Sequence, residues 1–138
     1  MTEPETPKPG TPKNTPAAPV EVQPTTDAAA LDRLRRFGGG KLLNEMISLF
    51  ISTAPERIAA ARAGVETNDA AAAELALHSL KSSSAQLGAM RMQRLSAEGE
   101  AQARVAALDV VSGLVRELEE EFPRMRSWLE HARNPEST

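Results

Sequence analysis

The sequence predicts an all-α protein, an antiparallel four-helix bundle with a short N-terminal helix covering one end. Apolar residues recur at steps of three and four through most of residues 28–130, which is the spacing of one helix face. Strand signals are lacking, since the chain has no alternating β-branched run and no Asn-Gly hairpin. Four long amphipathic segments with short connections pack most simply as an antiparallel bundle.

Composition divides the 138 residues into a tail and one domain. Seven of the ten prolines lie in residues 1–24, where large apolar side chains are almost missing. Such a segment buries too little surface to offset the entropy of ordering it, so residues 1–26 are predicted to be a disordered spacer or tether. A ligand for a proline-groove domain is the alternative. Residues 27–133 are predicted to form the bundle and 134–138 a disordered C-terminus. The tail and Met1 favour a free-standing protein.

The first two helices are predicted from their caps and stripes. Thr26 or Asp27 can cap a short helix over residues 28–37, which the glycines at 38–40 end, because glycine readily takes positive φ at a helix C-terminus. A second helix carries an apolar stripe with helical steps. The stripe comprises Leu43, Ile47, Phe50, Ala54, Ile58, Ala61 and Val65.

Three more helices follow. Residues 67–69 interrupt the pattern and cap a third helix over 70–87, which Gly88 stops. A fourth helix places five residues inward: Met92, Leu95, Gly99, Ala103 and Ala106. A fifth helix, capped by Asp109, carries Val111, Leu114, Leu118, Phe122, Met125 and Leu129.

Two prolines, Pro55 and Pro123, fall inside predicted helices. The apolar stripes stay in phase across both, so each proline is expected to bend its helix without ending it. Aromatic residues are only 3% of the chain, which predicts a core of Leu, Ala, Met, Val and Ile.

Charge and residue counts exclude several function classes. A net charge of −3 gives no support for nucleic-acid binding, which needs a clustered basic surface. The absence of cysteine rules out thiolate metal sites and cysteine nucleophiles, and two histidines make a histidine metal site improbable. No apolar run approaches the roughly 20 residues that span a bilayer, and no signal peptide is recognisable. We therefore predict a cytoplasmic protein without membrane or nucleic-acid partners and without a cofactor.

A polar cluster in the third helix stands out, the segment from His78 to Ser84. On a helical wheel Leu80 lies about 160° from His78, so a core-facing Leu80 places the imidazole in water. Glu74, Lys81, Ser82 and Ala85 fall within about 60° of His78 on the same exposed face. An ammonium near an imidazole favours an anion such as a phosphoryl group, and small neighbours let another protein approach the ring.

The segment from His78 to Ala89 resembles the histidine-containing phosphotransfer domain, whose usual pattern is H-x-L-K-G-S-S-x-x-L-G-A. The resemblance extends over roughly residues 28–130. It implies a four-helix phosphorelay carrier in two-component signalling, with His78 accepting the phosphoryl group from a receiver aspartyl-phosphate and passing it to another receiver. Lys81 would offset the added charge, and the receiver would bring Mg²⁺. The implied partners are response-regulator receivers and a hybrid histidine kinase, met by a monomeric carrier.

Two positions depart from the family pattern. Ser82 stands where the family has glycine, and its hydroxyl could help hold the phosphoryl group or obstruct docking. Gly99 stands where leucine is common, so the fourth helix is either loose or closely packed there. Glu100 occupies a position of Gln or Glu, which could orient the imidazole by accepting from its other nitrogen.

Each of these residues also has a structural interpretation. Glu100 and Lys81 could be solvated charges, and Ser83 and Ser84 small fillers between helices. Arg91 and Arg94 could steer an acidic receiver or be ordinary helix charges. His131 has no predicted function.

Two other functions compete with the carrier. An interaction bundle that binds receivers as a decoy or adaptor, without taking phosphate, is the alternative. An enzyme with its own active site is disfavoured, because the chain has no glycine-rich phosphate loop, no acidic Mg²⁺ cluster and no Ser-His-acid grouping.

Overall fold

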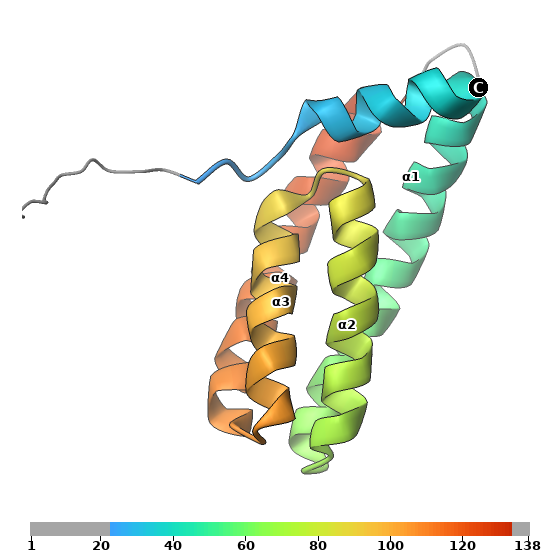
Figure 1. The fold of residues 1–138 in the computed structure, drawn as a ribbon. Coiled ribbons are helices and arrows are strands. Elements are labelled where there is room, and N and C mark those ends of the chain that lie inside the picture. The colour runs from blue at the N-terminus through green and yellow to red at the C-terminus, as the bar shows by residue number, and fades with distance from the viewer. Residues whose placement is uncertain (1–22, 134–138) are drawn as a thin grey trace, which may run out of the picture.

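The computed structural model describes residues 23–133, and these residues form four α-helices. The helices are α1 (Ala28–Glu66), α2 (Ala70–Gln86), α3 (Met90–Arg104) and α4 (Leu108–Ala132). Each packs against its neighbour in the chain, and α4 returns to α1, so that they enclose one core (Figure 1). The predicted all-α bundle is confirmed. The predicted C-terminus, 134–138, and residues 1–22 of the predicted tail lie outside the described residues.

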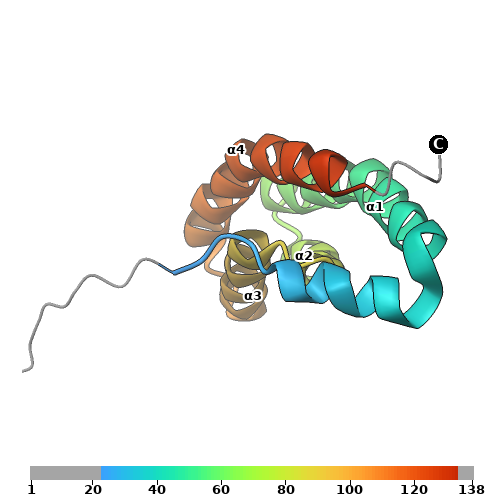
Figure 2. The ribbon, with the colours of Figure 1, turned by 90° about the horizontal axis from the view of Figure 1, so that it is seen from above.

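Helix α1 consists of two arms that meet at Gly39. This glycine has φ 75° and ψ −174°, which are the only non-helical dihedrals inside α1. The first arm lies across one end of the bundle and the second runs along its length (Figures 1 and 2). The first arm is the predicted short helix. One glycine, Gly39, ends this arm rather than the three glycines at 38–40, because a single residue with positive φ is enough to redirect the chain.

Two of the predicted helix caps are correct and one is wrong. The carboxylates of Asp27 and Asp69 each accept a hydrogen bond of 3.1 Å from a backbone N–H in the first turn. Helix α4 begins at Leu108, so Asp109 lies inside the first turn and Ala107 takes the cap position without a side-chain bond. There the Asp109 charge still interacts favourably with the helix N-terminus.

The inward-facing stripe predicted for α3 is wrong at its last member, Ala106. Helix α3 stops at Arg104, and Ala106 is exposed in the α3–α4 turn with φ 58°. Ala106 fits the helical spacing of the stripe, and its residue type gives no warning, because alanine occurs both in cores and in turns. The left-handed backbone at this residue lets the chain reverse toward α4.

The two prolines leave their helices unbroken, as predicted. Pro55 lies within α1 and Pro123 within α4, and both side chains are exposed. On the solvent side, the carbonyl group that a proline leaves without an amide partner can bond to water. The apolar stripes therefore continue past both positions.

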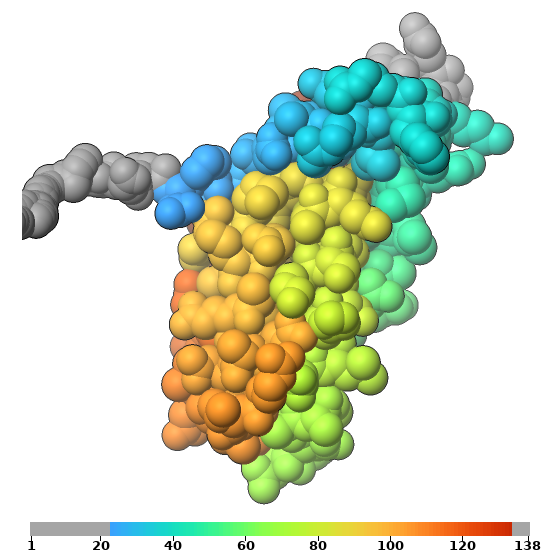
Figure 3. Space-filling model, in the orientation of Figure 1, coloured from blue at the N-terminus to red at the C-terminus, as the bar shows by residue number. Residues whose placement is uncertain are grey.

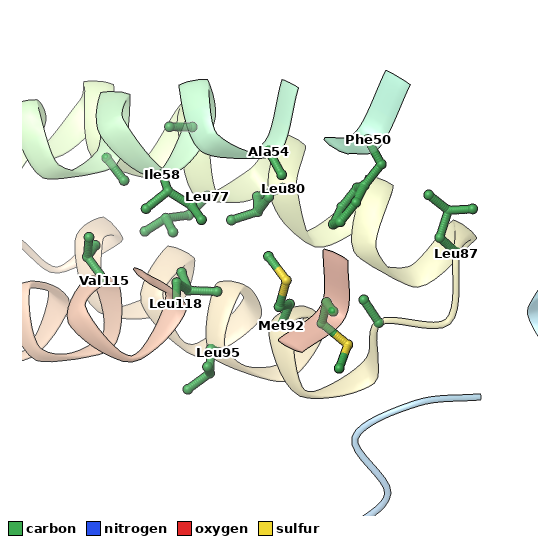
Figure 4. Packing of buried hydrophobic residues seen from close by; sticks show 14 of the residues in the cluster. Phe50, Ala54, Ile58, Leu77, Leu80, Leu87, Met92, Leu95, Val115 and Leu118 are labelled. Atoms are coloured by element: carbon green, nitrogen blue, oxygen red, sulfur yellow. The ribbon is translucent and has the colours of Figure 1, made fainter. Parts of the chain in front are cut away.

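The core consists mainly of Leu, Ala, Val, Ile and Met from all four helices (Figure 4). Within residues 23–133 Phe50 is the one buried aromatic residue, and its ring centroid lies 6.2 Å from that of the half-buried Phe122. The predicted core of Leu, Ala, Met, Val and Ile is thus confirmed, and Phe50 is buried at the inward position that the predicted stripe gives it. No helix in the described part of the chain is long and apolar enough to span a membrane.

Gly88 determines how α2 turns into α3. It has φ 73°, and a Cβ atom here would collide with the carbonyl oxygen of Asp27. The Asp27 N–H donates to the Gly88 carbonyl at 2.9 Å, and the Met90 N–H donates to the Thr25 carbonyl at 2.9 Å. The segment before α1 is therefore held against the turn. A glycine is required by both the positive φ and the close approach.

Gly99 lies where α3 packs on α2. A Cβ atom at this position would lie 2.9 Å from Cδ1 of Leu77, which is completely buried. Of the two interpretations of this glycine, close packing is the correct one. The short distance between the helices brings the next residue, Glu100, within reach of α2.

Replacing Gly99 and Gly113 is expected to change stability in opposite directions. Gly99→Leu should lower the free energy of unfolding by about 1–3 kcal/mol, because it overpacks the contact with Leu77. Gly113→Ala should raise it by about 0.5–1 kcal/mol, because a Cβ there meets nothing within 4 Å and alanine favours the helix. Urea unfolding of both variants measures the two effects. A Gly99→Leu variant as stable as the parent would contradict close packing.

Candidate functional site

His78 lies in the middle of α2 on the solvent side. Its side chain is 58% exposed, whereas Leu77 and Leu80, which are near it in the sequence, are completely buried. The exposure expected from the helical spacing is therefore confirmed. Helices α2 and α3 lie side by side and together form one face of the molecule (Figure 3).

Glu100 of α3 is the centre of a polar cluster on this pair of helices. The residue is only 6% exposed. Its Oε2 atom lies 2.8 Å from Nδ1 of His78, and its Oε1 atom lies 2.7 Å from Nζ of Lys81. The structure thus brings together His78, Lys81 and Glu100, three of the residues singled out in the sequence.

The contact with Glu100 determines which nitrogen of the His78 ring carries the proton. An ionised carboxylate can only accept hydrogen bonds, so Nδ1 is the donor. In the neutral ring, Nε2 then has no proton and keeps its lone pair. The geometry leaves a nucleophilic nitrogen on an exposed side chain.

The surroundings of Glu100 favour its ionised form. The hydrogen bond from Lys81 lowers the pKa of the Glu100 carboxyl most, and the hydrogen bond from His78 lowers it further. Burial acts in the opposite direction, but the pKa stays below its ordinary value of 4.5. The carboxylate is therefore charged throughout the physiological range.

This lowered pKa predicts a loss of stability in acid. A carboxyl group whose pKa is lower in the folded than in the unfolded state stabilises the fold above pH 4.5, and the contribution is lost as pH falls toward the folded-state pKa. Glu100→Gln should remove this dependence, so the difference in Tm between parent and variant should shrink below pH 4.5. Thermal unfolding from pH 7 to 3 measures it, and a constant difference would contradict the lowered pKa.

Two further charged residues belong to the cluster: Glu74, which the helical wheel places on the face of His78 without a role, and Arg104, which the sequence reasoning missed. Arg104 donates from Nη2 to Glu100 Oε2 at 3.2 Å and from Nε to Glu74 Oε2 at 2.9 Å. Beside Glu74, the pKa of Arg104 is raised above its ordinary value. A signal did exist, since both Glu74–His78 and Glu100–Arg104 are four residues apart on one helix.

The three serines after Lys81 differ in position. Ser82 is exposed, and its spacing from His78 places it one turn further along the same face of α2. Ser83 is half-buried and donates to the Leu80 carbonyl at 3.3 Å. Ser84 is completely buried. The position of Ser84 agrees with the predicted filler between helices.

The other polar residues considered in the sequence make contacts elsewhere in the molecule. Arg91 pairs with Glu117 at 3.0 Å and with the buried Glu121 at 3.5 Å. Arg94 donates to the Pro24 carbonyl at 2.9 Å. His131 bonds to the Ser127 carbonyl at 2.8 Å within α4. None of these contacts involves the cluster around His78.

Comparison with known families decides what this arrangement belongs to. The family model of the Hpt domain matches residues 45–128, which include the whole cluster around His78 and more than half of the chain. The chain belongs to the Hpt domain family. The match leaves out the first arm of α1, which covers the end of the Hpt bundle.

Solved structures of other Hpt proteins have the same fold. The crystal structure of histidine-containing phosphotransfer protein B (HptB) from Pseudomonas aeruginosa PAO1 aligns with a TM-score of 0.75 and 25% identity, over 81% of this chain and 96% of that one. The Hpt domain of a sensor hybrid histidine kinase from Shewanella aligns with a TM-score of 0.65 and 20% identity, over 78% and 92% of the two chains. No curated protein sequence matches the chain.

Membership of the Hpt family establishes the general class of function. The protein is a histidine phosphotransfer carrier of the phosphorelays in two-component signalling. Hpt domains interact in these relays with receiver domains and hybrid kinases.

Proposed function

We propose that His78 accepts a phosphoryl group on Nε2 from the aspartyl-phosphate of one receiver domain and passes it to another. The observation that supports this most directly is the 2.8 Å contact between His78 Nδ1 and Glu100. This contact leaves the lone pair of Nε2 available on a side chain that is 58% exposed. His131 has no carboxylate partner among residues 23–133, and its Nδ1 atom bonds to a backbone carbonyl.

The transfer needs no proton at the attacking nitrogen. Nε2 of His78 attacks the phosphorus, a P–N bond forms, and the P–O bond to the receiver aspartate breaks with its electron pair going to the carboxylate. The ring then carries a positive charge with the proton still on Nδ1. The hydrogen bond to the Glu100 carboxylate becomes charge-assisted, which stabilises the phosphorylated ring. The aspartate and Mg²⁺ would belong to the receiver.

Lys81 supplies positive charge for the phosphoryl group in this proposal. It follows His78 by three residues on α2, so the two side chains lie on neighbouring positions of the helix surface. Its side chain is 32% exposed and its ammonium group bonds to Glu100 Oε1. An ammonium group has three donors, so it can contact Glu100 and a phosphoryl oxygen together.

Ser82 gives a test of how tightly the receiver approaches. Ser82→Gly restores the residue usual in the family and should leave the transfer rate unchanged or raise it, if the side chain only crowds the exposed face of α2. A clear loss of rate would instead assign the hydroxyl to the phosphoryl group. Single-turnover transfer from a labelled receiver measures the difference. Circular dichroism controls for the lower helix propensity of glycine.

The docking surface that we propose for receivers is the exposed face of α2 and α3 around His78. A hollow beside the imidazole is lined by Ala71, Glu74, Leu75, His78, Glu100 and Arg104. Leu75 is 68% exposed one turn before His78, which gives the surface an apolar contact. We propose a transient contact made by a monomer with no turnover of its own and no membrane or nucleic-acid partner.

The proposal is tested by transfer from a receiver labelled with radioactive phosphate. A carrier takes up the label in an acid-labile, alkali-stable form, and mass spectrometry should locate it on His78. A decoy or adaptor would bind the receiver and stay unlabelled. Label on any other residue would also overturn the proposal.

A further inference from the structure

Arg104 and Glu74 form a second ion pair beside His78 that the proposed transfer does not use. Arg104 lies at the end of α3 and contacts two carboxylates, Glu74 at 2.9 Å and Glu100 at 3.2 Å. Its side chain is 60% exposed. The two carboxylates that it contacts lie on different helices, Glu74 on α2 and Glu100 on α3. A bridge of this kind restricts a flexible side chain more than a single surface pair does.

Glu100 accepts from cations on both of its oxygens. Lys81 bonds to Oε1, while Arg104 and the His78 ring share Oε2. The carboxylate is almost completely buried, so it needs at least one charged partner to stay ionised at low cost. Either Lys81 or Arg104 can meet that need.

Phosphorylation of His78 is expected to affect the contacts of Lys81 and Arg104 with Glu100 differently. In the proposed function Lys81 contacts the phosphoryl group as well as Glu100, and the added negative charge weakens the hold of Lys81 on Glu100. Arg104 stays on Glu100, because Glu74 anchors it on the α2 side through its Nε atom. A guanidinium group can bind two carboxylates at once through its separate N–H donors.

We infer that Arg104, clamped by Glu74, is a positioning residue that holds Glu100, and through it the Nδ1–H form of His78, when Lys81 is shared with the phosphoryl group. The inference rests on the proposed function of His78. It assigns redundant roles to Arg104 and Lys81 in the resting protein. Removing one cation should leave the proton on Nδ1, whereas removing both should release Glu100 and let the proton distribute between the two nitrogens.

Nitrogen NMR of the His78 ring in the full chain tests this directly. The single variants Arg104→Gln and Lys81→Ala should keep most of the Nδ1–H form, and the double variant should lose it. Arg126→Gln serves as the matched control, since Arg126 is 56% exposed and pairs with Glu130 four residues away on α4. The control should leave the ring unchanged, alone or combined with Lys81→Ala.

The transfer rate provides a second measurement. Arg104→Gln should slow phosphorylation of His78 by about two- to fivefold, which is the range for an exposed ion pair acting through a neighbour. Arg104→Lys keeps the charge but loses the two-sided contact, so it should recover only part of the rate. Glu74→Gln should behave like Arg104→Gln.

The outcomes separate this inference from the proposed function. Failure to label His78 in the parent protein overturns the proposed function and leaves the NMR result to decide the role of Arg104. An unchanged His78 tautomer in the folded double variant overturns the positioning role, even if transfer occurs. Equal slowing by Arg126→Gln would likewise reduce Arg104 to a general surface charge.

Discussion

His78→Gln is expected to abolish acid-labile phosphorylation of the protein while leaving its fold intact. Glutamine has no nucleophilic ring nitrogen, so the P–N bond cannot form. Its amide can still donate to Glu100, which preserves the pairing of a nearly buried carboxylate. Because the side chain is mostly exposed, the free energy of unfolding should change by no more than about 0.5 kcal/mol.

The measurement is a time course of label transfer from a phosphorylated receiver to parent and variant. His131→Gln is the matched control, because it removes the second and last histidine of the chain. This control should accept phosphate at the parental rate. Labelling of His78→Gln at any appreciable rate, or loss of labelling in His131→Gln, would contradict the assignment of His78.

Lys81→Ala is expected to slow transfer by roughly ten- to a hundredfold without abolishing it. A charge-assisted contact contributes about 1.5–3 kcal/mol, which corresponds to that range of rates when it acts on the transition state. His78 and Glu100 remain in place, and Arg104 still contacts Glu100, so a residual rate should persist. Single-turnover kinetics at saturating receiver separates this effect from weaker docking.

Lys41→Ala controls for the loss of one positive charge. Lys41 is 85% exposed on α1, and its only described ion pair is a 4.0 Å contact with Glu45. The variant should therefore transfer at the parental rate. Equal rates for Lys81→Ala and the parent would remove Lys81 from the mechanism, and equal slowing by Lys41→Ala would indicate general electrostatic attraction instead.

Local patterns were enough to predict the helices and the exposed side of α2. His78 and Leu80 lie nearly opposite each other on any α-helix, so burial of one places the other in solvent. The caps Asp27 and Asp69 were predictable for the same reason, since a cap involves only the first turn of its own helix. The motif from His78 to Ala89 indicated the family.

Sequence patterns gave wrong or incomplete predictions where the role of a residue depends on its tertiary contacts and does not follow from its position in a helical repeat. Asp109 was mistaken for a cap and Ala106 for a core residue, because the register of the α3–α4 turn depends on how the two helices pack. Gly88 and Gly99 are needed for close approaches to residues far away in the sequence.

The amino-acid sequence by itself determined an all-α bundle with an exposed histidine and a lysine one turn away. Only the tertiary structure decided that Glu100 is a buried partner of both and that Arg104 and Glu74 complete the cluster. The physical reason is the separation along the chain. Contacts within one helix follow from its fixed rise and turn, whereas contacts between α2 and α3 depend on the distance that Gly99 allows and the register that the Gly88 turn imposes.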